Sequence, residues 1–368
     1  MAEPRLANRT AIRRQNAETY LLITLVSFAA SVTLTRLFLY LTGYPQLGNS
    51  QLHIAHVLWG GLILFTASMI PLLYANRWAF NLSAVLAGIG VGLFIDEVGK
   101  FITRSNDYFF RPAAPIIYTV FLLTVMFFLI IRKNQHTDSR TNFYYTLQDL
   151  EEVIDHDLSE EELTTILYRL DQISKSKDDP VLAELAGSLR KYLQRDRFNL
   201  VPHRKSFLQK LNSTIMKLEK EWFTQGRLKA AIIGAEIGLA IWAVSYPFTI
   251  FSAVKDLSEL EKMLTELFVT GAVTGEPGII LLQIRVGLEG LIGLLLFLSA
   301  GLFLFGKEKQ GAVIGFFTLL VAVTIVDLLL FYFLQFFTII FALVQFIVML
   351  MIMRYQKRFS NPSTDRIL

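Results

Sequence analysis

Hydrophobic residues run along this chain in long stretches that are separated by shorter polar segments. A hydrocarbon core about 30 Å thick requires about 20 apolar residues for one helical span. The stretches that meet or approach this length lie at about residues 18–41, 52–74, 80–102, 113–131, 228–254, 279–305, 311–334 and 336–353. The pattern therefore predicts an all-α, polytopic membrane helix bundle of about eight spans. The border between the last two stretches is poorly marked, because the apolar run hardly breaks at Gln335.

The segment between the fourth and fifth spans has a different pattern. Apolar positions recur there at helical spacing among charged residues, and Ser159 followed by Glu162 is typical of a capping box at a helix start. An amphipathic stretch at about 254–268 is expected to lie in the membrane interface or to pack on the spans. We expect a membrane half at 1–133, a helical bundle at 134–226, a second membrane half at 227–358 and a tail at 359–368.

The composition supports a membrane protein: 53% of the 368 residues are hydrophobic and 18% are charged. The chain has no cysteine, which excludes disulfides, thiolate ligands and cysteine nucleophiles. A net charge of +4 that is spread over loops gives no support to a nucleic-acid partner. The first apolar run is too long for a signal peptide, so we interpret it as a retained span.

Lysine and arginine are more frequent in alternate loops, which predicts the orientation of the spans. Placing the N-terminus inside puts more of these residues in the cytoplasm, among them Arg77, Arg132 and Lys133. Both termini and the 134–226 insertion are then expected to be cytoplasmic.

The candidate chemistry lies where the second span begins and the third one ends. The third span runs through GIGVGLFIDEVGK, in which Asp96 and Glu97 are adjacent and Lys100 follows. The second begins at HIAH, whose His53 and His56 share one helix face. In the predicted orientation all of these lie near the outer leaflet. Ionisable groups at membrane depth are usually functional.

Two histidines and a carboxylate are suited to a divalent metal, zinc above all. His53, His56 and Asp96 would be the ligands, with an open position for an activated water. Glu97 would be a general base or further ligand, and Lys100 would orient an anionic group. Asp96 and Glu97 diverge by about 100° on a helix, so we expect only one of them to face the histidines squarely. Candidates for substrate contacts follow in the next loop: Arg104, Asn106, Asp107 and Tyr108.

The same residues also permit a network without metal. His56 can hydrogen-bond to Asp96, and Lys100 can form an intrahelical salt bridge with Asp96 or Glu97. The positive charge of Lys100 weakens the case for a cation site. Both interpretations stay open at this point.

A second polar set lies in the other half, with Arg285 and Glu289 in the sixth span and Asp327 in the seventh. A buried Arg285–Asp327 pair with Glu289 nearby is the structural interpretation, and a transport path is the functional one. Arg36, near the outer end of the first span, could join either set. Glu236 in the fifth span has no evident partner.

Glycines accompany the candidate site. Those at positions 60, 61, 88, 90 and 92 are interpreted as close helix-packing positions. Within spans two and three, two motifs resemble a pattern of uncharacterised bacterial multi-span membrane proteins over about 50 residues. They are H-x-x-H-x-x-x-G, formed by His53, His56 and Gly60, and G-x-G-x-x-x-D-E, formed by Gly90, Gly92, Asp96 and Glu97. The resemblance implies a shared site without an activity, in a bacterial inner (plasma) membrane.

Three functions fit these observations. The first is a metalloprotein, a hydrolase or transferase that acts on a lipid or lipid-linked substrate. The second is a transporter or channel whose ion or proton path runs through the two polar sets. The third is a sensor or scaffold in which an outer ligand alters the cytoplasmic bundle. Membrane lipid, a small-molecule ligand and a second copy of the chain are the expected partners.

Overall fold

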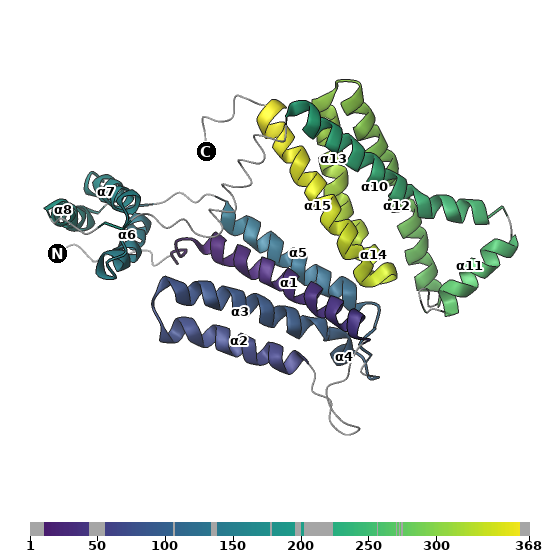
Figure 1. Ribbon diagram of the computed structural model, residues 1–368, viewed down its shortest axis with the longest axis horizontal. Coiled ribbons are helices and arrows are strands. Elements are labelled where there is room, and N and C mark those ends of the chain that lie inside the picture. Colours follow the sequence, from purple (N-terminus) through teal and green to yellow (C-terminus); the bar gives the residue numbers. More distant parts are fainter. Residues whose placement is uncertain are drawn as a thin grey trace, which may run out of the picture. The chain divides into compact units, whose positions relative to one another are not determined.

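The computed structural model describes residues 11–43, 56–105, 107–133, 138–176, 179–195, 200–201, 224–255, 257–269, 271, 273 and 275–360. Over these residues the chain is helical and contains no strand (Figure 1). The predicted all-α class is therefore confirmed.

Seven helical segments of the described chain are long and apolar enough to cross a membrane. Six of them are single helices: α1 (Ala17–Thr42), α2 (His56–Leu73), α3 (Arg77–Asp96), α5 (Ala113–Arg132), α10 (Gln225–Ala253) and α12 (Gly275–Leu304). The seventh segment is a continuous stretch of 52 residues, Glu308–Phe359. These lengths and compositions support the predicted membrane protein, while the number of spans that cross stays a prediction.

The 52-residue stretch folds back on itself. It contains α13 (Glu308–Val321), the π-helix η1 (Ala322–Val326), α14 (Asp327–Leu334), η2 (Gln335–Phe337), α15 (Thr338–Tyr355) and all but the last residue of η3 (Gln356–Ser360). Gln345 donates to Asp327 across the two arms, which shows that α15 returns alongside α14. The reversal occurs at Gln335, whose φ of 50° is unusual for a residue other than glycine. The predicted spans at 311–334 and 336–353 correspond to these two arms.

The chain divides into two compact units, residues 1–34, 58–93 and 124–211, and residues 35–57, 94–123 and 212–368. In the first unit α3 packs closely on α1, because a Cβ atom at Gly88 would overlap the Thr24 carbonyl and one at Gly92 would lie 2.7 Å from Ser31 Oγ. Gly90 faces Gly60 of α2 in the same way. Close packing is thus confirmed at these positions. The prediction of close packing is wrong for Gly61, where a Cβ atom would meet nothing within 4 Å.

The first unit also contains a bundle of α6 (Ser139–Ile154), α7 (Glu160–Ser174) and α8 (Pro180–Arg195). Its buried core is formed by Phe143, Leu158, Ile166, Leu170, Ile173, Ala186 and Leu193. The predicted capping box is present, since the Ser159 backbone N–H donates to Glu162 Oε2 at 2.9 Å. Arg77, at the start of α3, forms ion pairs with Asp149 and Glu152 of α6.

In the second unit α10, α12, α13 and α15 share a buried core that includes Ile232, Leu296, Phe303, Leu319 and Ile352. Figure 1 shows these helices running side by side in green to yellow. The beginning of α5 also packs against α14, where the Tyr118 and Phe331 rings stack at 4.4 Å. Two short helices complete the unit, α4 (Val98–Ile102) after α3 and the predicted amphipathic α11 (Leu257–Val269) after α10.

Candidate functional site

Asp96, the last residue of α3, lies at the centre of a buried polar cluster. Its Oδ1 accepts from Arg36 Nε at 2.5 Å, and its backbone carbonyl accepts from Arg36 Nη2 at 2.9 Å. Its Oδ2 lies 3.1 Å from His56 Nε2 and accepts from the Tyr108 hydroxyl at 2.8 Å. The Asp96 side chain is 0% exposed, so protein groups take the place of its hydration shell.

Glu97 is the second buried acid, and it also has several partners. Its Oε1 accepts from Lys100 Nζ at 2.7 Å and lies 3.4 Å from His56 Nδ1. Its Oε2 accepts from the backbone N–H of Val57 at 3.0 Å. The first amides of a helix have no partner inside the helix, and a negative charge there is favourable. Glu97 therefore caps the start of α2 from a neighbouring segment.

The imidazole of His56 lies between the two carboxylates, and its side chain is 23% exposed. We call this group of residues the His56 cluster: Arg36, His56, Asp96, Glu97, Lys100 and Tyr108. Of the two acids, Asp96 forms a hydrogen bond with His56, whereas Glu97 approaches the other ring nitrogen at 3.4 Å. The helix α3 ends at Asp96 and Glu97 adopts φ −94° and ψ 11°, so the two acids are not successive residues of one continuous helix.

The charges of the His56 cluster are balanced. Arg36 and Lys100 oppose Asp96 and Glu97, so the net charge is zero with a neutral imidazole and +1 with an imidazolium. The Arg36 guanidinium lies between two rings, 4.1 Å from the centre of Tyr108 and 4.0 Å from that of Phe336. Burial and the adjacent Asp96 raise the pKa of the Tyr108 phenol, which keeps it a hydrogen-bond donor.

The metal hypothesis meets a specific obstacle here. His56 and Asp96 lie together as it requires, but three of the four carboxylate oxygens already have cationic or N–H partners, and the fourth, Asp96 Oδ2, accepts from the Tyr108 hydroxyl. Within the residues that the structure describes, no group of three or more His, Cys, Asp or Glu could hold a metal ion. The remaining predicted ligand, His53, lies outside the described residues. The predicted metal site thus stays a prediction that depends on His53.

The predicted substrate contacts are distributed differently. Tyr108 belongs to the His56 cluster, while Arg104 is exposed. Asp107 shapes the loop, because its Oδ1 accepts from the Phe109 backbone N–H at 2.8 Å. Asn106 lies outside the described residues.

The second polar set is arranged around α12. Arg285 Nε lies 3.2 Å from Glu289 Oε1 on the next turn, and its guanidinium faces the Tyr246 ring at 4.2 Å. The prediction of an Arg285–Asp327 ion pair is wrong, because the Arg285 guanidinium forms its ion pair with Glu289 in the described structure. Asp327 Oδ1 instead accepts from Gln345 Nε2 at 3.3 Å, a partner that the sequence did not indicate.

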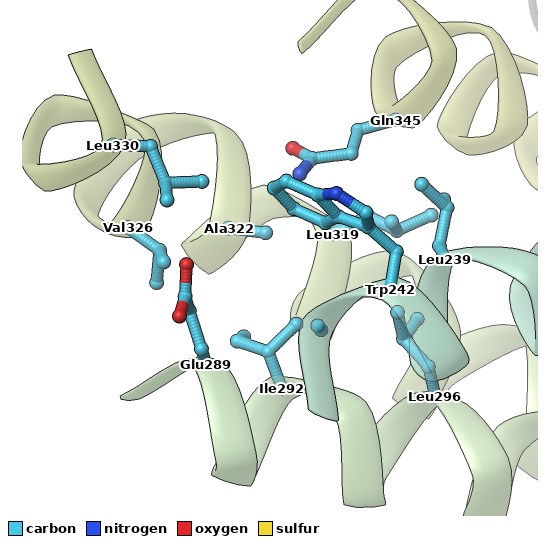
Figure 2. Close-up of a pocket in the computed structure, with 11 residues that line it drawn as sticks. Leu239, Trp242, Glu289, Ile292, Leu296, Leu319, Ala322, Val326, Leu330 and Gln345 are labelled. Carbon is cyan, nitrogen blue, oxygen red and sulfur yellow. The ribbon is translucent and has the colours of Figure 1, made fainter. Parts of the chain in front are cut away.

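A small cavity of about 10 Å³ lies beside this set, which is room for one water molecule. Figure 2 shows that Glu289 and Gln345 project among the apolar side chains that line it, with Trp242 next to Gln345. Three buried oxygens of the set have no hydrogen-bond partner in the described structure: Glu289 Oε2, Asp327 Oδ2 and Gln345 Oε1.

The end of α14 and the turn that follows it contact the two polar sets. Phe336 lies on Arg36 of the His56 cluster, and the ring of Phe333 lies 5.1 Å from the Arg285 guanidinium. Arg111 Nη1 donates to the Phe333 carbonyl at 3.2 Å. Sequence reasoning missed this connection, since aromatic residues in an apolar run carry no signal of their partners.

No family model matches this chain, and neither a curated protein nor a solved structure is significantly similar to it. The chemistry of these sites is therefore what indicates its function.

Proposed function

We propose that this chain is a proton-coupled transporter of a bacterial inner membrane, and that the His56 cluster is its proton-binding gate. In the predicted orientation the cluster faces the outside. The observation that carries the proposal is the position of one imidazole between two fully buried carboxylates.

Proton uptake by His56 changes the bonding of both acids. A neutral imidazole donates from one nitrogen only, whereas an imidazolium donates from both. The two nitrogens lie 3.1 Å from Asp96 Oδ2 and 3.4 Å from Glu97 Oε1. The neutral form therefore turns a lone pair toward one carboxylate, while the protonated form attracts both. The His56 side chain is 23% exposed, which leaves a route for the proton into the cluster.

The same proton acts on the ends of several helices. His56 begins α2, and the Glu97 carboxylate that it contacts also caps α2 through Val57. Asp96 ends α3 and binds Arg36 of α1. Loss of the proton therefore weakens the contacts between these helix ends, which is the change that a gate requires.

The α14–α15 turn gives the gate a connection to the second polar set. A movement of Arg36 acts on Phe336 of this turn, and Phe333 at the end of α14 lies on Arg285. Non-glycine residues at positive φ are strained and occur often at switching regions, and Gln335 lies in this turn. Arg285, Glu289 and Asp327 then form the second part of the proton path.

Burial also distinguishes the transporter from the metallohydrolase. A general base and metal ligands must reach a substrate, yet the side chains of Asp96 and Glu97 are 0% exposed and held by cations. A transporter needs buried acids that exchange partners during the cycle, and the His56 cluster provides these.

Proton flux into vesicles tests the proposal. Purified protein is reconstituted into liposomes that contain a pH-sensitive dye, with the membrane potential clamped by valinomycin and potassium. Flux is measured under a pH gradient with a panel of monovalent cations, divalent cations and anions. We expect at least one of these ions to support a flux that His56→Gln abolishes.

The matched control is His156→Asn, which changes a histidine of the bundle that has φ 55°. It should transport like the wild type. A flux that equals that of empty liposomes under every condition would count against a proton-coupled transporter of ions.

A further inference from the structure

Glu236 is a buried acid that the His56 cluster and the second polar set do not include. It lies about three turns into α10 and is 0% exposed. It lies beside Ser299 of α12 and Gly315 of α13, and no cation lies within ion-pair distance of it in the described structure. An isolated carboxylate at this depth is strongly disfavoured.

The hydrogen bonds around Glu236 indicate its protonation state. Its Oε1 lies 2.7 Å from Ser299 Oγ, and the same Oγ lies 2.9 Å from the Gly311 carbonyl oxygen of α13. A hydroxyl has one hydrogen to donate, so it serves only one of these two acceptors. With an ionised Glu236, two oxygens would therefore face each other without a hydrogen between them.

A protonated carboxyl removes this conflict. Its O–H donates to Ser299 Oγ, and the serine hydroxyl donates in turn to the Gly311 carbonyl. We infer that Glu236 is a proton-binding site of the C-terminal helices, occupied by its proton in this conformation. This inference goes beyond the proposed transport, since the proton can be detected whether or not any ion is carried.

The packing of α13 makes room for this group. A Cβ atom at Gly315 would overlap Glu236 Oε1 and would lie 2.6 Å from Ser299 Oγ. The second oxygen, Oε2, is buried without a hydrogen-bond partner in the described residues. The charged pair Lys229–Glu308 lies about 10 Å away along α10, so the Glu236 site itself contains no other charge.

Infrared spectroscopy tests the inference directly, because the carbonyl stretch of a protonated carboxyl lies apart from the bands of a carboxylate. Spectra of wild-type protein and of Glu236→Gln are compared in lipid vesicles near neutral pH. We expect one protonated-carboxyl band to disappear in the variant. Glu308→Gln, which removes an ion-paired acid, should leave that band in place.

Two further measurements protect the test against a variant that does not fold. In wild-type protein the band should vanish reversibly as the pH rises, while helicity is retained. In Ser299→Ala the band should persist at a shifted frequency, because the acid loses its acceptor. A carboxylate band in place of the expected one, or a proton that leaves only when the protein unfolds, would overturn the assignment of a proton-binding site.

Discussion

Arg36 binds Asp96 twice, through Nε to the carboxylate at 2.5 Å and through Nη2 to the backbone carbonyl at 2.9 Å. One guanidinium thereby neutralises the acid and fixes the end of α3. The planar fork of arginine suits two acceptors in this geometry, whereas an ammonium group does not.

Arg36→Leu should therefore destabilise the protein by about 3 kcal/mol or more, because it leaves the buried Asp96 without its cation. Arg36→Lys should recover only part of this loss. The measurement is the free energy of unfolding in detergent. Arg104→Leu, which changes an exposed arginine, should shift stability by no more than about 0.5 kcal/mol. Equal losses in the two leucine variants would contradict a structural role for the Arg36–Asp96 pair.

Two glycine substitutions should have opposite effects. Gly92→Ala places a methyl group 2.7 Å from Ser31 Oγ, and overpacking of this kind costs about 1–3 kcal/mol. Gly61→Ala meets nothing within 4 Å, so the better helix propensity of alanine should stabilise α2 by up to about 1 kcal/mol. Thermal unfolding of both variants in the same detergent checks the prediction. It fails if Gly92→Ala is as stable as the wild type.

The pH dependence of stability should contain a contribution from Glu152. Burial raises the pKa of its carboxyl from 4.5 to about 7, with Glu162 adding to the rise and Arg77 opposing it. Since the folded pKa lies above the ordinary value, the protonated form favours folding. This stabilisation is complete below pH 4.5 and is lost as the pH rises through about 7.

Glu152→Gln should flatten the stability profile across that pH range. Thermal unfolding at several pH values measures the effect, and Glu160→Gln, at an exposed position of α7, is the control. A Glu152→Gln profile with the slope of the wild type would show that this carboxyl does not titrate as expected.

The absence of cysteine allows a single reporter thiol to be introduced. Phe101 of α4 is 64% exposed and follows Lys100, so Phe101→Cys reports on the end of α3 and on α4. We expect its maleimide labelling to accelerate several-fold at high pH, by more than the labelling of the control Ile154→Cys, which lies at a position that is 76% exposed and reports the thiolate effect alone. Adding His56→Gln to Phe101→Cys should remove this additional rise in the labelling rate. If the additional rise persists, another group controls the opening.

Metal content separates the proton-binding interpretation from the metalloprotein hypothesis. Because Arg36 and Lys100 occupy the two acids, we expect purified protein to hold far less than one metal ion per chain. Mass spectrometry of the metals in wild type and in a His53→Ala, His56→Ala variant measures this. Near-stoichiometric zinc that the variant loses would support the metalloprotein instead.

Local patterns in the sequence determined the elements of this protein. Runs of apolar residues specified the long helices, because a membrane span must satisfy its backbone hydrogen bonds within one helix. Ser159 and Glu162 specified the start of α7, since a capping box involves residues only three positions apart. The missing side chain of Gly88 likewise indicated a close helix contact before any partner was known.

The tertiary structure alone decided which residues meet. The cap of α2 by Glu97, the contact of Phe336 with Arg36, and the hydrogen bonds that join Glu236 to Ser299 all link separate segments. Each depends on the rotation and axial position of one helix against another, or on the residue at which a helix ends. A periodicity within one segment defines the apolar face of that helix, but it does not specify the partner, the register or the end. The polar residues of the candidate site were therefore visible in the sequence, and their pairing was not.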